Sequence, residues 1–363
     1  MTPDAVAREV GVAAQVWIIG GYGDVGRKLA GMLAQDGGMS VVIAGRDGGR
    51  ADAAAEAIAP NVRGVGLDVA NAVANELPPA VYVNLVEATP PDLIAALVSR
   101  GARLIESSAT PAYLETQESA VGERSGPGLL IVNAGVSPGL TNVMATALKR
   151  RFPDTRSVHI VIEIGMGRHH GDAATRWTFA SMGADYPMWR EGQEARVRPG
   201  VLSRMVRFEE DRSERLAIGF GFSDQIAIGR QLEFDTAQTF LAVDPPWVTR
   251  TIHAALRAGF GKHLACRARG LANLFARGPT MGRPGTRLIV EGHDNVGNVS
   301  GRIEIHTGDQ ATATAAMLAR AVRSVVDTDV AGIGQFNDLV TLEDAVTVLK
   351  TAAPTTRVFE RDN

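Results

Sequence analysis

The sequence predicts an α/β protein in which an N-terminal doubly wound parallel sheet is followed by a second α/β domain with a mixed or antiparallel sheet. Three observations predict this class. In the first third of the chain, short apolar runs alternate with helical patterns, the order that βαβ units produce. A glycine-rich turn follows the first apolar run. Later segments alternate apolar and polar residues, as strands with one solvated face do.

Six apolar runs mark the strands of the first domain, and helical patterns fill most of the gaps. The strands are expected at 16–20, 40–44, 62–67, 81–86, 104–106 and 129–133. The helices are expected at 25–33, 51–59, 91–99 and 112–121. Parallel strands need crossover connections of this kind, and right-handed crossovers place helices on both faces of the sheet.

The pattern changes around residues 133–139. After a helix at 141–151, alternating strands are expected at 157–165, 287–291 and 301–306. The turn-forming segment 293–299 joins the last two and predicts an antiparallel hairpin. Helices at 246–258 and 312–326 are expected on one face of this second sheet.

Length and composition limit the classes of function. A chain of 363 residues is too long for one ordinary core, and its net charge of −3 gives no reason to expect nucleic acid or an anionic membrane as a partner. Secretory and transmembrane patterns are missing, which predicts a cytoplasmic protein. Cys266 is the single cysteine, so an internal disulfide and a thiolate metal cluster are excluded.

The most informative motif is a G-x-G-x-x-G sequence between a predicted strand and a predicted helix. Its first glycine permits a tight turn, its second lets backbone approach a pyrophosphate, and its third lets the helix pack closely on the sheet. The helix N-terminus offers unpaired N–H groups to the phosphates. The sequence therefore predicts a Rossmann domain whose turn binds a dinucleotide through Gly21, Tyr22, Gly23, Asp24, Val25 and Gly26.

The end of the second strand predicts NADP(H) as the cofactor. NAD enzymes usually place an acid there for the ribose 2′-hydroxyl, whereas NADP sites use arginine. Arg46 occupies this position, and no acid precedes it. Asp47 leaves an alternative open, because it either binds a ribose or caps the next helix.

The remaining predicted cofactor contacts follow later strands: Asp68, Val69, Asn84, Leu85, Ser107 and Pro138. Asp68 closes the third strand, where such domains hold the adenine ring, but it is equally suited to cap a helix. Asn84 ends the fourth strand at the ligand-bearing edge and is expected to line the nicotinamide half of the site. The turn at 137–141 either offers N–H groups to a carboxylate or cofactor amide or simply joins the domains.

Five segments together resemble the saccharopine dehydrogenase-like family of NAD(P)-dependent oxidoreductases. They are GGYGDVGRKLAGMLA (20–34), VVIAGRD (41–47), LIESSATPAYLE (104–115), NAGVSPGLTNVMA (133–145) and AGIGQFNDLVTLEDAVTVL (331–349). The first two are shared by many NADP enzymes, and the last two are more specific. Where relatives typically show an aspartate at the fifth strand, this chain has Glu106, which leaves the role of that acid open.

The resemblance implies an organisation and a chemistry. It implies a Rossmann domain at 1–135, a substrate and dimerisation domain at 136–328, and a C-terminal segment at 329–363 that returns to the first domain. It also implies a homodimer. The implied reaction is hydride transfer at a carbon–nitrogen bond of a small molecule, forming or oxidising a secondary amine or an amino acid.

The catalytic candidates follow the strand at 157–165: His169, His170, Asp172 and Arg176. Histidine exchanges protons near neutral pH, and arginine holds carboxylates through two hydrogen bonds. Alternatively, Asp172 caps a helix and the histidines lie on a solvated loop. A metal is not expected, because adjacent histidines point apart on a strand and no third ligand stands out.

The leading prediction is an NADP(H)-dependent oxidoreductase acting on the C=N bond of an amino-acid or polyamine derivative. The first alternative is an NADPH-dependent reductase of C=O or C=C bonds in a lipid or secondary metabolite. An apolar cleft lined by the Phe, Met and Trp residues of 177–189 would favour that alternative, whereas convergent arginines would favour a carboxylated amine. The second alternative is a non-catalytic NADP-binding regulator.

Overall fold

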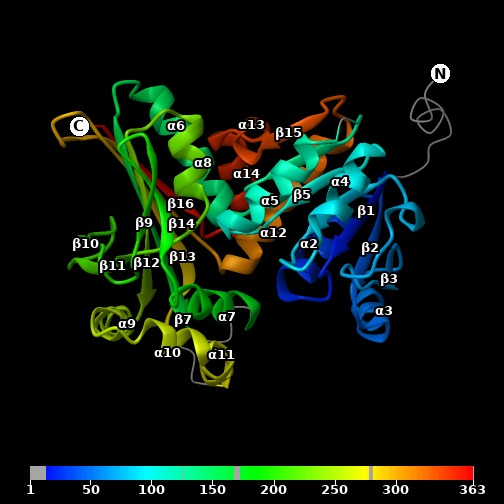
Figure 1. The fold of residues 1–363 in the computed structure, drawn as a ribbon, viewed down its shortest axis with the longest axis horizontal. Coiled ribbons are helices and arrows are strands. Elements are labelled where there is room, and N and C mark those ends of the chain that lie inside the picture. The colour runs from blue at the N-terminus through cyan, green and yellow to red at the C-terminus, as the bar shows by residue number, and fades with distance from the viewer. Residues whose placement is uncertain (1–13, 125, 167–171, 278–280, 363) are drawn as a thin grey trace. The chain divides into compact units, whose positions relative to one another are not determined.

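A computed structural model describes residues 14–124, 126–166, 172–277 and 281–362. The chain divides into two compact units, each built around its own sheet (Figure 1). The first unit contains the chain up to Ser108 together with Glu115–Val132 and Leu318–Gly334. The second contains Ala109–Leu114, Asn133–Met317 and the chain from Gln335 onward.

The first unit holds a seven-stranded sheet in the order β15-β6-β5-β4-β1-β2-β3. Strands β1 to β6 pair in parallel, and the order 3-2-1-4-5-6 is that of dinucleotide-binding folds. The predicted doubly wound parallel sheet is confirmed. The strands are β1 (Ala14–Ile19), β2 (Met39–Gly45), β3 (Val62–Gly66), β4 (Val81–Asn84), β5 (Arg103–Glu106), β6 (Leu129–Val132) and β15 (Gly332–Gln335).

Burial explains why these segments form strands and helices. Residues 16–19 of β1 and 41–45 of β2 are all buried, as strands covered on both faces must be. Helix α2 buries Gly26, Leu29, Ala30 and Leu33, whose spacing places them on one helical face. The helices that follow the strands are α2 (Asp24–Ala34), α3 (Gly48–Glu56), α4 (Pro91–Ser99) and α5 (Pro111–Gly122), with a short 3-10 turn η1 (Ala74–Glu76).

The second unit holds a nine-stranded mixed sheet with the central order β10-β11-β12-β7-β13-β14-β16, and β8 pairs with β12 and β9. Strand β12 pairs in parallel with β7, and the other strand pairs in the described part of this sheet are antiparallel. The strands are β7 (Ser157–Met166), β8 (Tyr186–Arg190), β9 (Gln193–Val197), β10 (Ser203–Val206), β11 (Arg215–Gly219), β12 (Thr236–Asp244), β13 (Met281–His293), β14 (Val299–Thr307) and β16 (Arg357–Asp362). The predicted mixed sheet and the hairpin of β13 and β14 are confirmed.

The second sheet has two different faces. On one, Val161, Phe240 and Ile289 pack with Phe208 in a buried cluster. The opposite face carries side chains that alternate with these, such as Ile162, and lies against helices. The helices of this unit are α6 (Thr141–Arg151), α7 (Asp172–Ser181), α8 (Asp224–Gln231), α9 (Pro246–Arg257), α10 (Gly261–Cys266), α11 (Ala268–Arg277), α13 (Phe336–Leu339) and α14 (Leu342–Ala352), while α12 (Gln310–Val326) runs from the second unit into the first.

The C-terminal segment departs from the expected course. The expectation was that 329–363 returns to the first domain, but only its beginning, β15, lies there. Strand β16 pairs antiparallel with β14 in the second sheet. Arg151 holds it with two 2.6 Å ion pairs, to Glu360 and Asp362.

None of the helices in the described ranges is long and apolar enough to span a bilayer.

Candidate functional site

The glycine turn lies between β1 and α2, as predicted. The Gly21 amide donates to the Ile18 carbonyl at 3.1 Å, and the Gly23 amide donates to the Gly20 carbonyl at 3.0 Å. A Cβ on Gly26 would lie 2.5 Å from the Gly21 Cα, so only glycine lets the helix approach this closely. Gly23 caps α2 without a side-chain hydrogen bond, which leaves N–H groups of the first turn for an anion.

Two arginines and an aromatic ring gather at the end of β2. Arg46 is exposed directly after the strand. Tyr22 packs over Gly45, where a Cβ would meet its ring at 2.3 Å, and the Arg50 guanidinium lies 4.6 Å from the Tyr22 ring centroid. Asp47 accepts a 3.0 Å hydrogen bond from the Arg50 amide and thus caps α3, which favours the capping alternative. Sequence reasoning missed Arg50, although its place in the first turn of α3 was a usable signal.

A buried polar group lies at the ends of β4 and β5. Asn84 and Glu106 are opposite in the ladder, and Asn84 Nδ2 donates to Glu106 Oε2 at 2.6 Å. Glu106 Oε1 accepts from the Ser108 amide at 2.9 Å, and Thr89 Oγ1 donates to Asn84 Oδ1 at 2.8 Å. Burial raises the pKa of Glu106 to about 8, against the opposing hydrogen bonds. The acid is therefore mainly neutral at pH 7.

The other predicted cofactor residues lie in varied surroundings. Asp68 accepts from the Ala70 amide at 3.3 Å and from Asn71 Nδ2 at 2.8 Å, so it holds a turn. The capping alternative for Asp68 is wrong, because the next helical turn, η1, begins only at Ala74. Val69 is buried and Leu85 half-buried, while the Ser107 amide donates to the Asn84 carbonyl at 3.1 Å.

The turn at 136–140 lies in the second unit, and Pro138 within it is buried. The Gly139 amide donates to Asn142 Oδ1 at 3.0 Å, and the Leu140 amide donates to the Gly135 carbonyl at 2.9 Å. Ser137 Oγ donates to the buried Asp224 carboxylate at 2.6 Å. Two of the N–H groups proposed for a ligand are therefore already used by the turn itself.

The predicted catalytic cluster is described only in part. His169 and His170 lie outside the described residues. Asp172 is the first residue of α7, and Arg176 is exposed on the same helix. Next to Arg176, Trp177 Nε1 donates to Thr110 Oγ1 at 2.9 Å.

A mainly apolar cavity lies within the second unit, on the helix-bearing face of the sheet. Its floor is formed by β7, β11 and β12, and its walls by α7, α9 and α11. Trp177, Phe179 and Met182 line it, which are three of the aromatic and methionine residues expected at 177–189. Among the described residues that line it, those with hydroxyl or amide side chains are Ser137, Thr175, Thr178, Thr249 and Gln310.

A groove on the other face of the second sheet gathers arginines from β10, β14 and β16. Arg204 pairs with Glu291 at 2.7 Å, Arg302 lies 3.5 Å from the same carboxylate, and Arg361 pairs with Glu209. The convergent arginines of this groove are not the predicted Arg176, and they pair with carboxylates of the protein itself.

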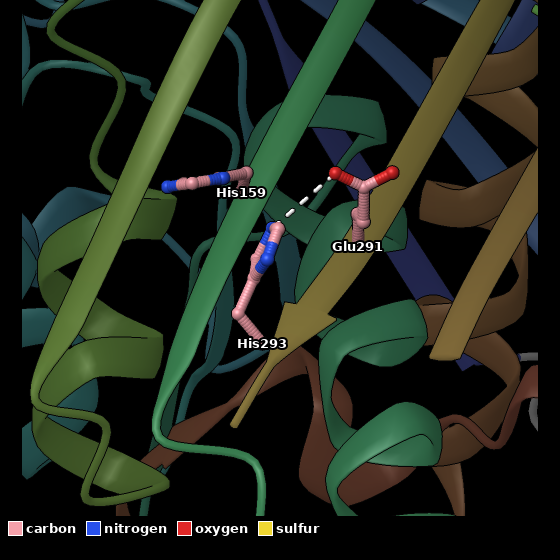
Figure 2. Close-up of side chains that lie close together, drawn as sticks. All are labelled: His159, Glu291 and His293. Carbon is pink, nitrogen blue, oxygen red and sulfur yellow. Dashed lines mark ion pairs between the residues drawn. The ribbon is translucent and has the colours of Figure 1, made fainter. Parts of the chain in front are cut away.

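Glu291 of this groove also lies close to His159 and His293, and the ligand atoms of the three are all within 4.8 Å of one another. Figure 2 shows the ion pair between Glu291 and His293, at 3.3 Å. Burial, followed by the charge of Arg204, lowers the pKa of His159 to about 3, so this ring is neutral. The guanidinium groups of Arg204 and Arg302 already contact Glu291, and their positive charges would repel a metal cation at this carboxylate. The cluster fits an ion-pair network better than a divalent metal.

Comparisons with known proteins support the fold. No family model and no curated protein matches the sequence. Saccharopine dehydrogenase (L-Glu forming) from Saccharomyces cerevisiae matches with a TM-score of 0.59 at 12% identity, covering 96% of this chain and 100% of that one. A myo-inositol dehydrogenase from Corynebacterium glutamicum matches with a TM-score of 0.44 at 12% identity, covering 97% and 99%. The likeness to saccharopine dehydrogenase is one of fold, and it confirms the fold that the sequence resemblance implied.

Proposed function

We propose that this chain is an NADP(H)-dependent oxidoreductase. The observation that carries the proposal is the turn from Gly20 to Gly26, which joins a buried strand to a helix whose first N–H groups have no side-chain cap. In an open parallel sheet this position, outside the carboxyl end of the first strand, is where pyrophosphates bind. The nicotinamide would supply or accept the hydride.

The residues at the end of β2 support NADP(H) over NAD(H). Arg46 is exposed there, and Asp47 is engaged as the cap of α3. Arg50 adds a second guanidinium, stacked on Tyr22. Charge-assisted hydrogen bonds to a 2′-phosphate contribute about 1.5–3 kcal/mol, enough for a roughly ten- to hundredfold preference.

At the ends of β4 and β5, the neutral Glu106 and its partner Asn84 would border the nicotinamide half of the site. Glu106 does not face solvent, so we assign it a positioning role: it holds Asn84 through their 2.6 Å hydrogen bond.

The sequence resemblance favours a C=N bond of an amino-acid or polyamine derivative as the bond that is reduced or formed. A second candidate is a C=O or C=C bond of an apolar metabolite, and the cavity lined by Trp177, Phe179 and Met182 favours it. Both reactions use the same cofactor site.

Titration calorimetry with NADPH and NADH tests the cofactor assignment. We expect NADPH to bind at least about tenfold more tightly, and Arg46→Ala to remove most of that preference. Arg190→Ala, a change of an exposed arginine in the second unit, is the matched control and leaves both affinities unchanged. Failure of both nucleotides to bind would refute the proposal. Binding without turnover of any imine, carbonyl or enoyl substrate would instead support the non-catalytic regulator.

A further inference from the structure

The cavity of the second unit has a continuous apolar lining from two sides. Ile162, Ile164, Leu241 and Val243 come from the central strands β7 and β12, and alternate with residues that point to the opposite face. From the helices, Phe179 and Phe275 contact each other with ring centroids 5.4 Å apart. The cavity thus lies between the middle of a sheet and a helical layer.

No charged side chain lines this cavity among the described residues. Several of its polar groups are already satisfied within the protein. Ser137 Oγ donates to Asp224, Thr178 Oγ1 donates to the Ala174 carbonyl at 2.9 Å, and Thr249 Oγ1 donates to the Val243 carbonyl at 3.1 Å. A carboxylate or ammonium entering the cavity would lose its hydration without gaining a charged partner.

The helices that wall the cavity also expose large apolar side chains. Trp247 at the start of α9 is 56% exposed, and Leu274 on α11 is 66% exposed. Apolar surface is therefore present on these helices outside the cavity as well as within it.

We propose that this cavity binds an uncharged molecule that is largely hydrocarbon. If the chain is the oxidoreductase proposed above, on which this step rests, the substrate is an uncharged apolar carbonyl or enoyl compound. An amino acid or a polyamine does not suit this cavity. Ligand binding to the cavity is independent of the cofactor and is tested without it.

The test uses the full chain and the uncharged fluorophore N-phenyl-1-naphthylamine, followed by displacement with three ligands of equal chain length. We expect 1-decanol to displace the fluorophore at a concentration at least about tenfold lower than decanoate or decylammonium, because only the latter two bring a charge into the cavity. The binding of NADPH is measured by titration in a separate experiment.

Two variants on one helix locate the site. Ala174 lines the cavity yet is exposed, so Ala174→Trp obstructs it at little risk to folding. Ala180 is exposed on the same helix but is not among the lining residues, so Ala180→Trp is the matched control. We expect fluorophore affinity to fall about tenfold in the first variant and by less than about twofold in the second.

Each outcome decides one question. No binding of the fluorophore, equal effects of the two tryptophans, or equally good displacement by decanoate would overturn the apolar site. If the fluorophore binds as expected but NADPH does not bind, the cavity assignment stands and the proposed oxidoreductase function fails. If both bind, NADPH oxidation in the presence of decanal or of 2-decenal supports the substrate class. If neither compound causes NADPH oxidation, the substrate class is contradicted.

Discussion

Asn84 Nδ2 donates a 2.6 Å hydrogen bond to Glu106 Oε2, and both side chains are completely buried. The two residues end adjacent parallel strands, β4 and β5, at the edge where open α/β sheets bind ligands. The groups that act on Glu106 are Asn84, Ser107, Ser108 and Glu87, and a buried carboxyl group in such surroundings holds its proton in preference to ionising. This relationship links the titration of Glu106 to the stability of the first unit.

The ionisation of Glu106 should therefore lower the stability of the folded protein as the pH rises. Its pKa is raised from 4.5 to about 8 in the folded protein, so the folded state binds the proton more tightly than the unfolded state. Between these values the unfolded state ionises first, and the contribution to stability decreases by about 1.4 kcal/mol per pH unit. It is fully present below pH 4.5 and lost above about pH 8.

Glu106→Gln removes this titration. Denaturation at a series of pH values should show the wild type losing stability relative to the variant as the pH rises from 5 to 8, because only the wild type has a proton to hold at this position. The exposed Glu115→Gln on α5 is the control and should follow the wild-type curve. Parallel curves for wild type and Glu106→Gln would contradict the raised pKa.

The three glycines near the turn should respond differently to alanine. In Gly26→Ala the new Cβ would lie 2.5 Å from the Gly21 Cα, which we expect to cost about 1–3 kcal/mol of stability as well as NADPH affinity. Gly23 is exposed and its Cβ would lie 3.1 Å from the Gly20 carbonyl oxygen, so Gly23→Ala should weaken NADPH binding more than folding.

Gly31 provides the matched control in the same helix. A Cβ there would meet no atom within 4 Å, and so Gly31→Ala should stabilise the protein by about 0.5–1 kcal/mol without changing cofactor affinity. Thermal unfolding and calorimetric titration of the three variants check both quantities. Unchanged NADPH affinity in Gly23→Ala would exclude the turn as the phosphate site.

A substitution of Asp47 distinguishes the two roles considered for this residue, helix capping and ribose binding. Its side chain accepts the Arg50 amide, so Asp47→Ala should destabilise the protein by about 0.5–2 kcal/mol. The ratio of NADPH to NADH affinity should not change. A selective loss of NADH affinity would show that Asp47 reaches a ribose.

The sequence predicted the first unit well because its signals are local. Continuous apolar runs such as 41–44 identify buried strands, and the glycine spacing identifies the turn. Helix 141–151 was predicted with the bounds that α6 has. The strands between 186 and 219 were not predicted, because β9 and β10 are mostly solvent-exposed and carry little apolar periodicity.

The candidate site was only partly predictable for a different reason. Arg46 and Asn84 stand at strand ends that the sequence identifies. The protonation of Glu106, in contrast, depends on burial by distant segments, and the cavity depends on α7, α9 and α11 meeting one sheet. The course of β16 likewise depends on pairing with β14, a contact between residues far apart in the chain.

The ionic network of the second sheet gives a final prediction. Arg287 is buried and donates from Nε to Glu163 at 2.8 Å and from Nη1 to Asp211 at 3.0 Å. Burial alone would raise the pKa of Asp211, but hydrogen bonds from Arg287 and Arg215 lower it to about 2. Arg287→Met removes one of the positive charges that balance the carboxylates of Glu163 and Asp211. The variant should lose about 3–5 kcal/mol of stability at neutral pH.

The pH dependence of this variant follows from the same contacts. A lowered folded-state pKa stabilises the protein above the unfolded pKa of 3.8, and that stability is lost as pH falls toward 2. Without Arg287 the pKa of Asp211 rises, so the stability difference between wild type and Arg287→Met should shrink as pH falls through this range. Urea unfolding from pH 7 to pH 2 measures it, with Arg190→Met as the exposed control. A loss below about 0.5 kcal/mol at pH 7, the usual size for a surface change, would mean that the network contributes little.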